Sequence, residues 1–360
     1  MRIAFAFLAM ALAARDLHLP AMHDLARIPV CFLVSLILAL AGCGEPSGSP
    51  LDDAGALVPR EDADTGRVFR GVYPLDARFP EGGTYDAQTH AFFVGSLGDG
   101  SVHRIDAETG AQRLLFRESA PGTWWTLGMD VDSARRRLHV CAMEDRRELE
   151  GGDVPYDGYV WTFDADSGER LATVALADAF PDATCTDVAV AADGTLYVCD
   201  REHPNLYRID AEGSVSLFVT DDALDGAVVG QNALVVLPDQ SALLSVVYLP
   251  SRLVRISLPE GAVREVDIDG DFLDGTPFLS GADGMTYSDG EVLVAFTSQL
   301  VRLTPTLADW SQARSTSVDV PEGMTDVIHT PESDYMLNGQ AVDFAFDREP
   351  RPFELVAITR

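Results

Sequence analysis

Basic residues are scarce in this 360-residue chain. It has 26 Lys and Arg against 57 Asp and Glu, which gives a formal net charge of -31. Such an excess of negative charge repels phosphate backbones and anionic lipid headgroups, so we expect no nucleic-acid partner. The acidity is typical of a well-hydrated surface and does not by itself indicate a metal site.

Several signatures of common enzyme classes are also missing. The sequence has no Gly-x-Ser-x-Gly elbow, no phosphate-binding loop and no dinucleotide fingerprint, which argues against the corresponding hydrolases, nucleotide-binding and dinucleotide-binding enzymes. Helical periodicity is not sustained anywhere. Hydrophobic residues still make up 47% of the chain, enough to bury a sizeable core, so we expect a folded body.

A short apolar run near the N-terminus follows Arg27 and ends in Leu-Ala-Gly-Cys at Cys43. The run is too short to span ~30 Å of hydrocarbon comfortably, and small residues and a polar tail follow it. A transmembrane anchor is therefore the less favoured alternative. The segment resembles a bacterial lipoprotein signal, and this resemblance implies cleavage before Cys43 and lipidation of its sulfur.

We accordingly predict that residues 1–42 are a signal peptide, with translation starting at Met22 because the segment before it adds a second, unneeded apolar stretch. The resemblance implies a protein of the bacterial cell envelope that touches the membrane only through its lipid. Gly44, the residue after the lipidated cysteine, favours the outer membrane. Residues 43–66 are rich in Gly, Pro, Ser and Asp and are predicted to be a flexible acidic tether.

Only five cysteines are present. Cleavage and lipidation leave Cys141, Cys185 and Cys199, an odd number, so at least one thiol stays free or pairs between chains. One disulfide could form in an oxidising compartment, and buried thiols are the alternative. No Cys-x-x-Cys pair indicates a zinc site.

From Phe79 onward the chain repeats one pattern: a strand, a turn rich in Asp, Gly or Pro, an alternating strand, and a third strand that often carries Arg. Turn residues between two short strands of alternating polarity predict antiparallel hairpins. Repeats of ~45 residues with several strands each are typical of propeller blades. We therefore predict an all-β fold, a six-bladed β-propeller of four-stranded antiparallel blades over residues 67–360. The segment 67–72 is expected to close the ring as the outer strand of the last blade.

In a propeller the innermost strand of each blade lines the central channel. Alignment of the repeats on these strands places one position at the channel mouth in every blade. The six residues at that position are Glu81, Leu127, Thr186, Asn232, Asp283 and Met324. Three of them, Glu81, Asn232 and Asp283, carry strong oxygen donors.

The motifs Pro80-Glu81-Gly82, Asn232-Ala233 and Asp283-Gly284 resemble those of the senescence marker protein/gluconolactonase family, the regucalcin-like propellers. This resemblance covers roughly residues 79–360. It implies that Glu81, Asn232 and Asp283 bind one divalent cation, Ca²⁺ or Zn²⁺, and that the substrate is a small lactone or ester. Two carboxylates and an amide oxygen suit such a cation and leave room for water. We expect the metal to polarise a carbonyl or activate water, with Asp283 as general base.

Two departures from the family concern the substrate. The family often has Asn and Arg where this chain has Thr186 and Thr184, so sugar-lactone specificity does not follow from the resemblance. We predict that Thr186, Asp187 and Trp125 contribute to substrate binding. For Asp187 the alternative is an anchor for the backbone of a neighbouring blade, and for Trp125 it is packing between blades.

The favoured interpretation is thus an exported lipoprotein with metal-dependent lactonase or esterase activity. The alternative is a non-catalytic propeller that uses the same face to bind a ligand or a protein. The sequence sets no oligomeric state.

Overall fold

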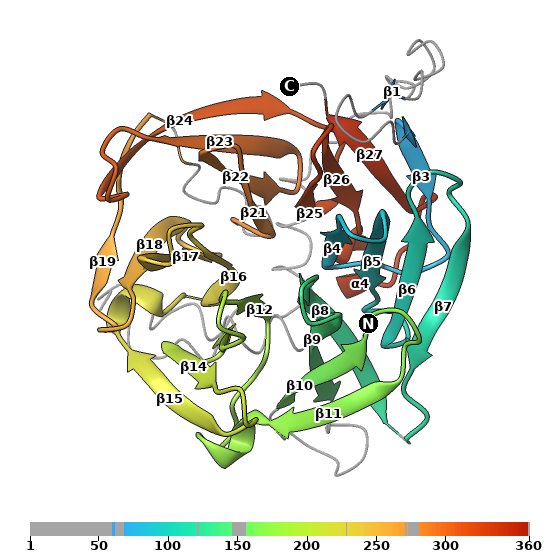
Figure 1. Ribbon diagram of the computed structural model, residues 1–360. Coiled ribbons are helices and arrows are strands. Elements are labelled where there is room, and N and C mark those ends of the chain that lie inside the picture. The colour runs from blue at the N-terminus through green and yellow to red at the C-terminus, as the bar shows by residue number, and fades with distance from the viewer. Residues whose placement is uncertain are drawn as a thin grey trace, which may run out of the picture.

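The computed structural model describes residues 60–61, 68–120, 122–145, 156–227, 229–270, 272 and 281–358. Six blades surround a central axis (Figure 1), so the predicted six-bladed β-propeller is confirmed. The predicted signal peptide (1–42) and Cys43 lie outside the described residues. Within the described ranges, no helix is long and apolar enough to cross a membrane.

Each of the first four blades is a four-stranded antiparallel sheet whose strands follow one another in the sequence. Blade one consists of β4 (Gly83–Asp86), β5 (Ala91–Gly95), β6 (Ser101–Asp106) and β7 (Gln112–Arg117). Blade two consists of β8 (Thr123–Asp132), β9 (Arg137–Asp145), β10 (Asp157–Asp164) and β11 (Arg170–Ala175). Blade three consists of β12 (Asp187–Val190), β13 (Leu196–Cys199), β14 (Asn205–Ile209) and β15 (Val215–Thr220). Blade four consists of β16 (Gln231–Val236), β17 (Ala242–Val247), β18 (Arg252–Ser257) and β19 (Val263–Glu265).

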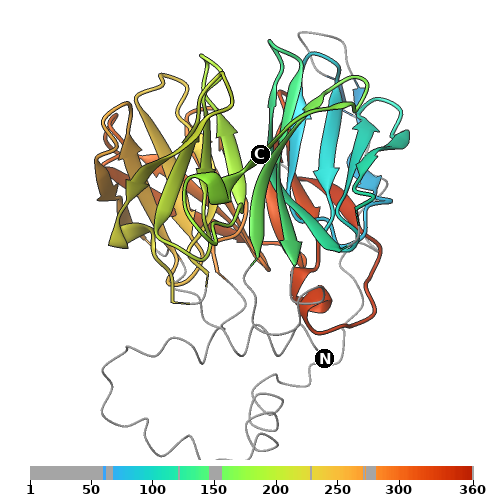
Figure 2. The ribbon, with the colours of Figure 1, turned by 90° about the horizontal axis from the view of Figure 1, so that it is seen from below.

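The last two blades depart from this scheme. Blade five consists of β21 (Met285–Ser288), β22 (Glu291–Phe296), β23 (Gln299–Pro305) and β24 (Gln312–Asp319), with β20 (Asp267–Asp269) added in parallel outside β24. Blade six combines β25 (Met324–His329), β26 (Asp334–Asn338) and β27 (Glu354–Ile358) with β3 (Val72–Pro74). Short helical segments are η3 (Leu176–Asp178), η4 (Asp222–Leu224) and α4 (Ala341–Ala345), the last at one end of the ring (Figure 2).

The ring closes through β3, which pairs antiparallel with β27. An N-terminal strand therefore closes the ring as predicted, but it lies at Val72–Pro74 and shares only Val72 with the predicted segment. Burial of Tyr73 fixes this register, because its hydroxyl donates to the carbonyl of Ala107 at 2.6 Å. Upstream, Val68–Phe69 (β2) pairs instead with Arg60–Glu61 (β1), so two residues of the predicted tether form a strand.

The turn between β21 and β22 shows how local sequence builds a blade. Ser288 pairs with Glu291, and the two residues between them are Asp289 with φ 49° and Gly290 with φ 94°. Positive φ at both central positions is the geometry that matches the twist of a two-residue hairpin, and Asp-Gly adopts it readily. This Asp-Gly pair thus specifies the hairpin between β21 and β22.

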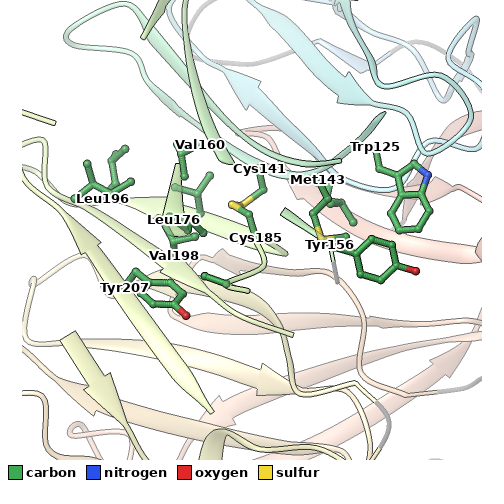
Figure 3. Packing of buried hydrophobic residues seen from close by; sticks show 14 of the residues in the cluster. Trp125, Cys141, Met143, Tyr156, Val160, Leu176, Cys185, Leu196, Val198 and Tyr207 are labelled. Carbon is green, nitrogen blue, oxygen red and sulfur yellow. A yellow bond between two sulfur atoms is a disulfide. The ribbon is translucent and has the colours of Figure 1, made fainter. Parts of the chain in front are cut away.

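The hydrophobic core is divided among the blade interfaces, where six clusters of buried side chains lie. The cluster between blades two and three contains a disulfide from Cys141 to Cys185, whose Cα atoms are 5.2 Å apart (Figure 3). Cys199 is a buried free thiol. Of the three cysteines in the folded body, Cys141 in β9 and Cys185 just before blade three therefore form the disulfide, and Cys199 stays unpaired.

Candidate functional site

A cavity of about 290 Å³ lies on the axis of the ring and is lined by the inner strand of every blade. Its lining is unusually acidic. Five carboxylates line it, from Glu81, Asp130, Asp187, Asp283 and Asp326. Carboxylates that share one cavity repel one another, so the cavity is suited to protons or cations.

The three predicted metal ligands all line this cavity. Glu81 precedes β4, Asn232 is the second residue of β16, and Asp283 precedes β21. Each stands at the start of its inner strand, so the three lie at the same end of the cavity, which we call the mouth. Asn232 Nδ2 donates to Asp283 Oδ1 at 2.5 Å.

Local backbone contacts fix Asp283 in this position. Its N–H donates to the carbonyl of Ala295 in the neighbouring strand, and the next residue, Gly284, donates to the carbonyl of Thr325 in blade six. A Cβ atom on Gly284 would lie 2.0 Å from Asp326 Oδ1. Glycine is therefore required here for the close approach of blades five and six.

The environment of the mouth perturbs both carboxylates. Burial, followed by the charges of Asp283 and Asp326, raises the pKa of Glu81 well above its usual range. Burial and the charge of Asp326 raise the pKa of Asp283 to about 8, although the hydrogen bond from Asn232 acts in the opposite direction. The charged form of both carboxylates is therefore disfavoured unless a cation compensates the charge.

The other three carboxylates of the cavity connect neighbouring blades. Asp130 accepts from the N–H of Val190 at 2.9 Å, and Asp187 accepts from the N–H of Leu234 at 2.8 Å. The third, Asp326 of blade six, accepts from the N–H of Gly83 of blade one at 2.9 Å. We call these three residues the clamp carboxylates. For Asp187, the backbone anchor that the sequence left as an alternative is thus present.

The remaining predicted site residues lie away from the cavity lining. Thr186 is 1% exposed, and Trp125 is 6% exposed and packs on Tyr156 with ring centroids 5.1 Å apart. Figure 3 shows Trp125 beside Tyr156 at the edge of the cluster between blades two and three. Their substrate-binding roles stay predictions.

The sixth residue at the mouth is Thr325, whereas the sequence alignment placed Met324 there. Thr325 lines the cavity, and the side chain of Met324 is buried in the cluster between blades five and six. A register shift between Met324 and Asp326 causes the difference. A bulge inserts one residue and moves the following side chains to the other face, which strand alternation alone does not reveal.

Sequence reasoning missed Asp130, Asp326 and Arg201. A signal for the first two existed, because Asp130, Asp187 and Asp326 are each followed by Val on an inner strand. Arg201 follows β13 in a loop, and its charge partly offsets the rise in the pKa of Glu81 and of Asp283. No periodic pattern marks a loop position of this kind.

The donor set at the mouth fits a divalent cation. Glu81 and Asp283 supply carboxylate oxygens, and the amide of Asn232 already contacts Asp283, so its oxygen can be presented to the same point by rotation of the amide. Hard cations prefer such oxygen ligands. Among the described residues, no three His, Cys, Asp or Glu side chains are grouped so that they could hold a metal ion by themselves, and a site at the mouth would also need the amide of Asn232.

Comparison with solved structures places the chain among propellers of this shape. The major allergen Mala s 1 of Malassezia sympodialis is 16% identical, with a TM-score of 0.66 over 81% of this chain and 96% of that chain. A gluconolactonase from Xanthomonas campestris is 17% identical, with a TM-score of 0.55 over 80% of this chain and 88% of that one. A luciferin-regenerating enzyme is 12% identical, with a TM-score of 0.55 over 80% and 95%.

These likenesses show a common fold and nothing finer, because the identities are so low. No protein-family model matches the sequence. No curated protein matches it at a significant level of similarity. The chain is therefore a six-bladed propeller whose fold is shared with a gluconolactonase, among other proteins.

Proposed function

We propose that the mouth of the cavity binds one divalent cation, Ca²⁺ or Zn²⁺, and that the protein hydrolyses lactones or esters there. The observation that supports this most directly is that Glu81, Asn232 and Asp283, distant in sequence, line one cavity, with Asn232 and Asp283 in contact. The fold shared with a gluconolactonase is consistent with the proposal.

A bound cation would polarise the substrate carbonyl and lower the pKa of water. The residues of this chain hold the reacting groups. In the metal-free site Asn232 donates a hydrogen bond to the Asp283 carboxylate. With the cation bound, the Asn232 amide would turn its oxygen to the cation, and Glu81 would be ionised and contribute a second negative charge at the mouth. Without a cation, burial and Asp326 raise the pKa of Asp283 to about 8. A bound cation would lower this pKa, so that Asp283 would be ionised at neutral pH and could accept a proton from the attacking water, as a general base requires.

The test starts with metal binding by the full-length protein purified in detergent. We expect calorimetry to detect one Ca²⁺ or Zn²⁺ site in the wild type, and we expect Asp283→Ala to lose it. Asp319→Ala is the matched control, because Asp319 is exposed and lies in the same blade. Equal binding by all three proteins would contradict the site.

A panel of lactones and aryl esters, assayed with and without chelator, then tests catalysis. Hydrolysis that stops on chelation and returns with the cation supports the proposal. Metal binding without hydrolysis of any panel member would instead favour the alternative of a propeller that binds a ligand or protein without catalysis. Hydrolysis that is unchanged by chelation would contradict the metal-dependent mechanism.

We also propose that the protein is exported and anchored by a lipid on Cys43. The Cys141–Cys185 disulfide supports export, since such bonds persist in oxidising compartments. Labelling with a radioactive fatty acid should mark the wild type and not Cys43→Ser. Membrane fractionation should find the labelled protein with the outer membrane, and its recovery in the cytosol would contradict the proposal.

A further inference from the structure

Arg201 is held beside the mouth by its own backbone. Its N–H donates to Thr184 Oγ1 at 3.1 Å, and its carbonyl accepts from the N–H of Gly230 at 2.8 Å. Gly230 stands two residues before Asn232 in the sequence. The loop after β13 is therefore fixed against the start of β16, next to a proposed metal ligand.

The same backbone contacts continue along this side of the mouth. The backbone N–H of Tyr248 donates to the carbonyl of Gly230 at 2.9 Å, and the N–H of Ala282 donates to the carbonyl of Tyr248 at 3.2 Å. Ala282 directly precedes Asp283. One wall thus runs from Arg201 through Tyr248 to Asp283, built from loops of blades three, four and five.

The guanidinium of Arg201 is largely buried in this wall, with 13% of its side chain exposed. Its Nε has no hydrogen-bond partner among the described residues, since Glu202 Oε1 lies 3.6 Å away, within ion-pair range but beyond a hydrogen bond. A buried guanidinium with an unused donor is costly unless a ligand supplies the acceptor.

The positive charge of Arg201 interacts with groups at the mouth. Its Coulomb interaction reaches the side chains of Glu81, Asp283 and Tyr248. Arg201 is the positive charge that acts on each of these three groups, and the side chains that line the cavity include no Arg or Lys. A positive group beside an acidic cavity is suited to an oxygen that becomes negative.

We propose that Arg201 binds the acyl oxygens of the ligand, namely the carbonyl oxygen of a lactone or ester and the carboxylate of the hydroxy acid released from it. This inference rests on the proposed function. In hydrolysis a water oxygen bonds to the carbonyl carbon, and its proton passes to Asp283. The acyl C–O bond then breaks, the leaving oxygen takes up a proton, and the acid ionises. Negative charge therefore grows on the acyl oxygens, which the fork of a guanidinium binds in pairs.

The test measures binding of a product-like carboxylate, 4-hydroxybutyrate, against its neutral amide, 4-hydroxybutyramide, in the full-length protein with Ca²⁺ present. We expect the wild type to prefer the carboxylate by about tenfold or more, the factor expected from a charge-assisted hydrogen bond. Because the bound Ca²⁺ also favours a carboxylate, Arg201→Gln should reduce the preference by about tenfold, and Arg201→Lys should keep more of it. Arg208→Gln is the matched control, because Arg208 is exposed on the same blade.

A wild type without the preference, or an Arg201→Gln protein that keeps the preference in full, would overturn the inference. Should Arg201→Gln fail to fold, the comparison of Arg201→Lys with the wild type decides in its place. The Ca²⁺ affinity of the same variants separates this inference from the proposed function, because loss of a positive charge should leave that affinity equal or slightly higher. Carboxylate preference without chelator-sensitive hydrolysis would contradict the enzymatic proposal alone.

Discussion

The carboxylate of Asp326 accepts a hydrogen bond of 2.9 Å from the backbone N–H of Gly83, which lies 243 positions earlier in the chain. It joins the inner strands of blades six and one, the two blades that meet where the ring closes. The same carboxylate also accepts from the N–H of Val327. Two backbone donors in a buried place therefore depend on one side chain.

Asp326→Ala should lower the free energy of unfolding by roughly 2 to 4 kcal/mol at pH 5.5, because both donors lose their acceptor while they stay buried. Urea unfolding followed by tryptophan fluorescence measures the loss. Asp319→Ala, an exposed change, should stay within about 0.5 kcal/mol of the wild type. An equally small effect for Asp326→Ala would show that the hydrogen bonds to Asp326 contribute little to the free energy of unfolding.

The stability of the metal-free protein should fall as the pH rises from about 5 to 8.5. Burial raises the pKa of Asp326 to about 7 in the folded state, above its usual value, so the folded state binds the proton more tightly than the unfolded chain. The corresponding stabilisation is present at low pH and is lost as the pH rises through 7. We expect a decrease of roughly 2 to 3 kcal/mol from this group. Urea unfolding in chelator at several pH values measures the slope, which Asp326→Asn should make shallower, while the raised pKa values of Asp283 and Glu81 keep part of it.

Tyr73→Ala should destabilise the whole propeller by about 3 to 5 kcal/mol, because Tyr73 is 1% exposed in the closing strand. Tyr73→Phe keeps the ring and loses only the hydrogen bond to Ala107, so we expect a cost of about 1 kcal/mol. Thermal unfolding should show one cooperative transition in each protein. A transition confined to blade six would argue against closure by this strand.

Removal of the disulfide by Cys141→Ala with Cys185→Ala should cost about 2 to 4 kcal/mol, since the bond closes a loop with a sequence separation of 44. The change should be seen as a lower urea midpoint without reductant. Cys199→Ala should leave the response to reductant intact, because that thiol is unpaired. Equal midpoints for the oxidised and reduced wild type would contradict a stabilising role.

Most of the fold could be predicted from the sequence repeat. Turn pairs such as Asp289-Gly290 mark hairpins through local backbone preference alone, so blade number and strand order could be predicted. The closing strand was displaced because its register depends on where Tyr73 becomes buried. That choice involves Ala107 in another blade, and no local pattern contains it.

The candidate site divides in the same way. That Glu81, Asn232 and Asp283 line one cavity could be predicted, because each occupies the same place in its repeat. Thr325 was missed because one bulge shifts the strand. Arg201 and the Cys141–Cys185 pair depend on how loops and neighbouring blades meet in space, which a single sequence does not encode in any periodic form.

Blade six is made from both ends of the folded chain, since β3 is completed with β25, β26 and β27. During synthesis, β3 leaves the ribosome long before residues 354–358 exist. Until then the first five blades can form only an open arc, with the edges of blades one and five uncovered. Contacts that join such distant segments form slowly, so we expect closure of the ring to be the last and rate-limiting event of folding, and the stage at which the chain depends most on protection from aggregation.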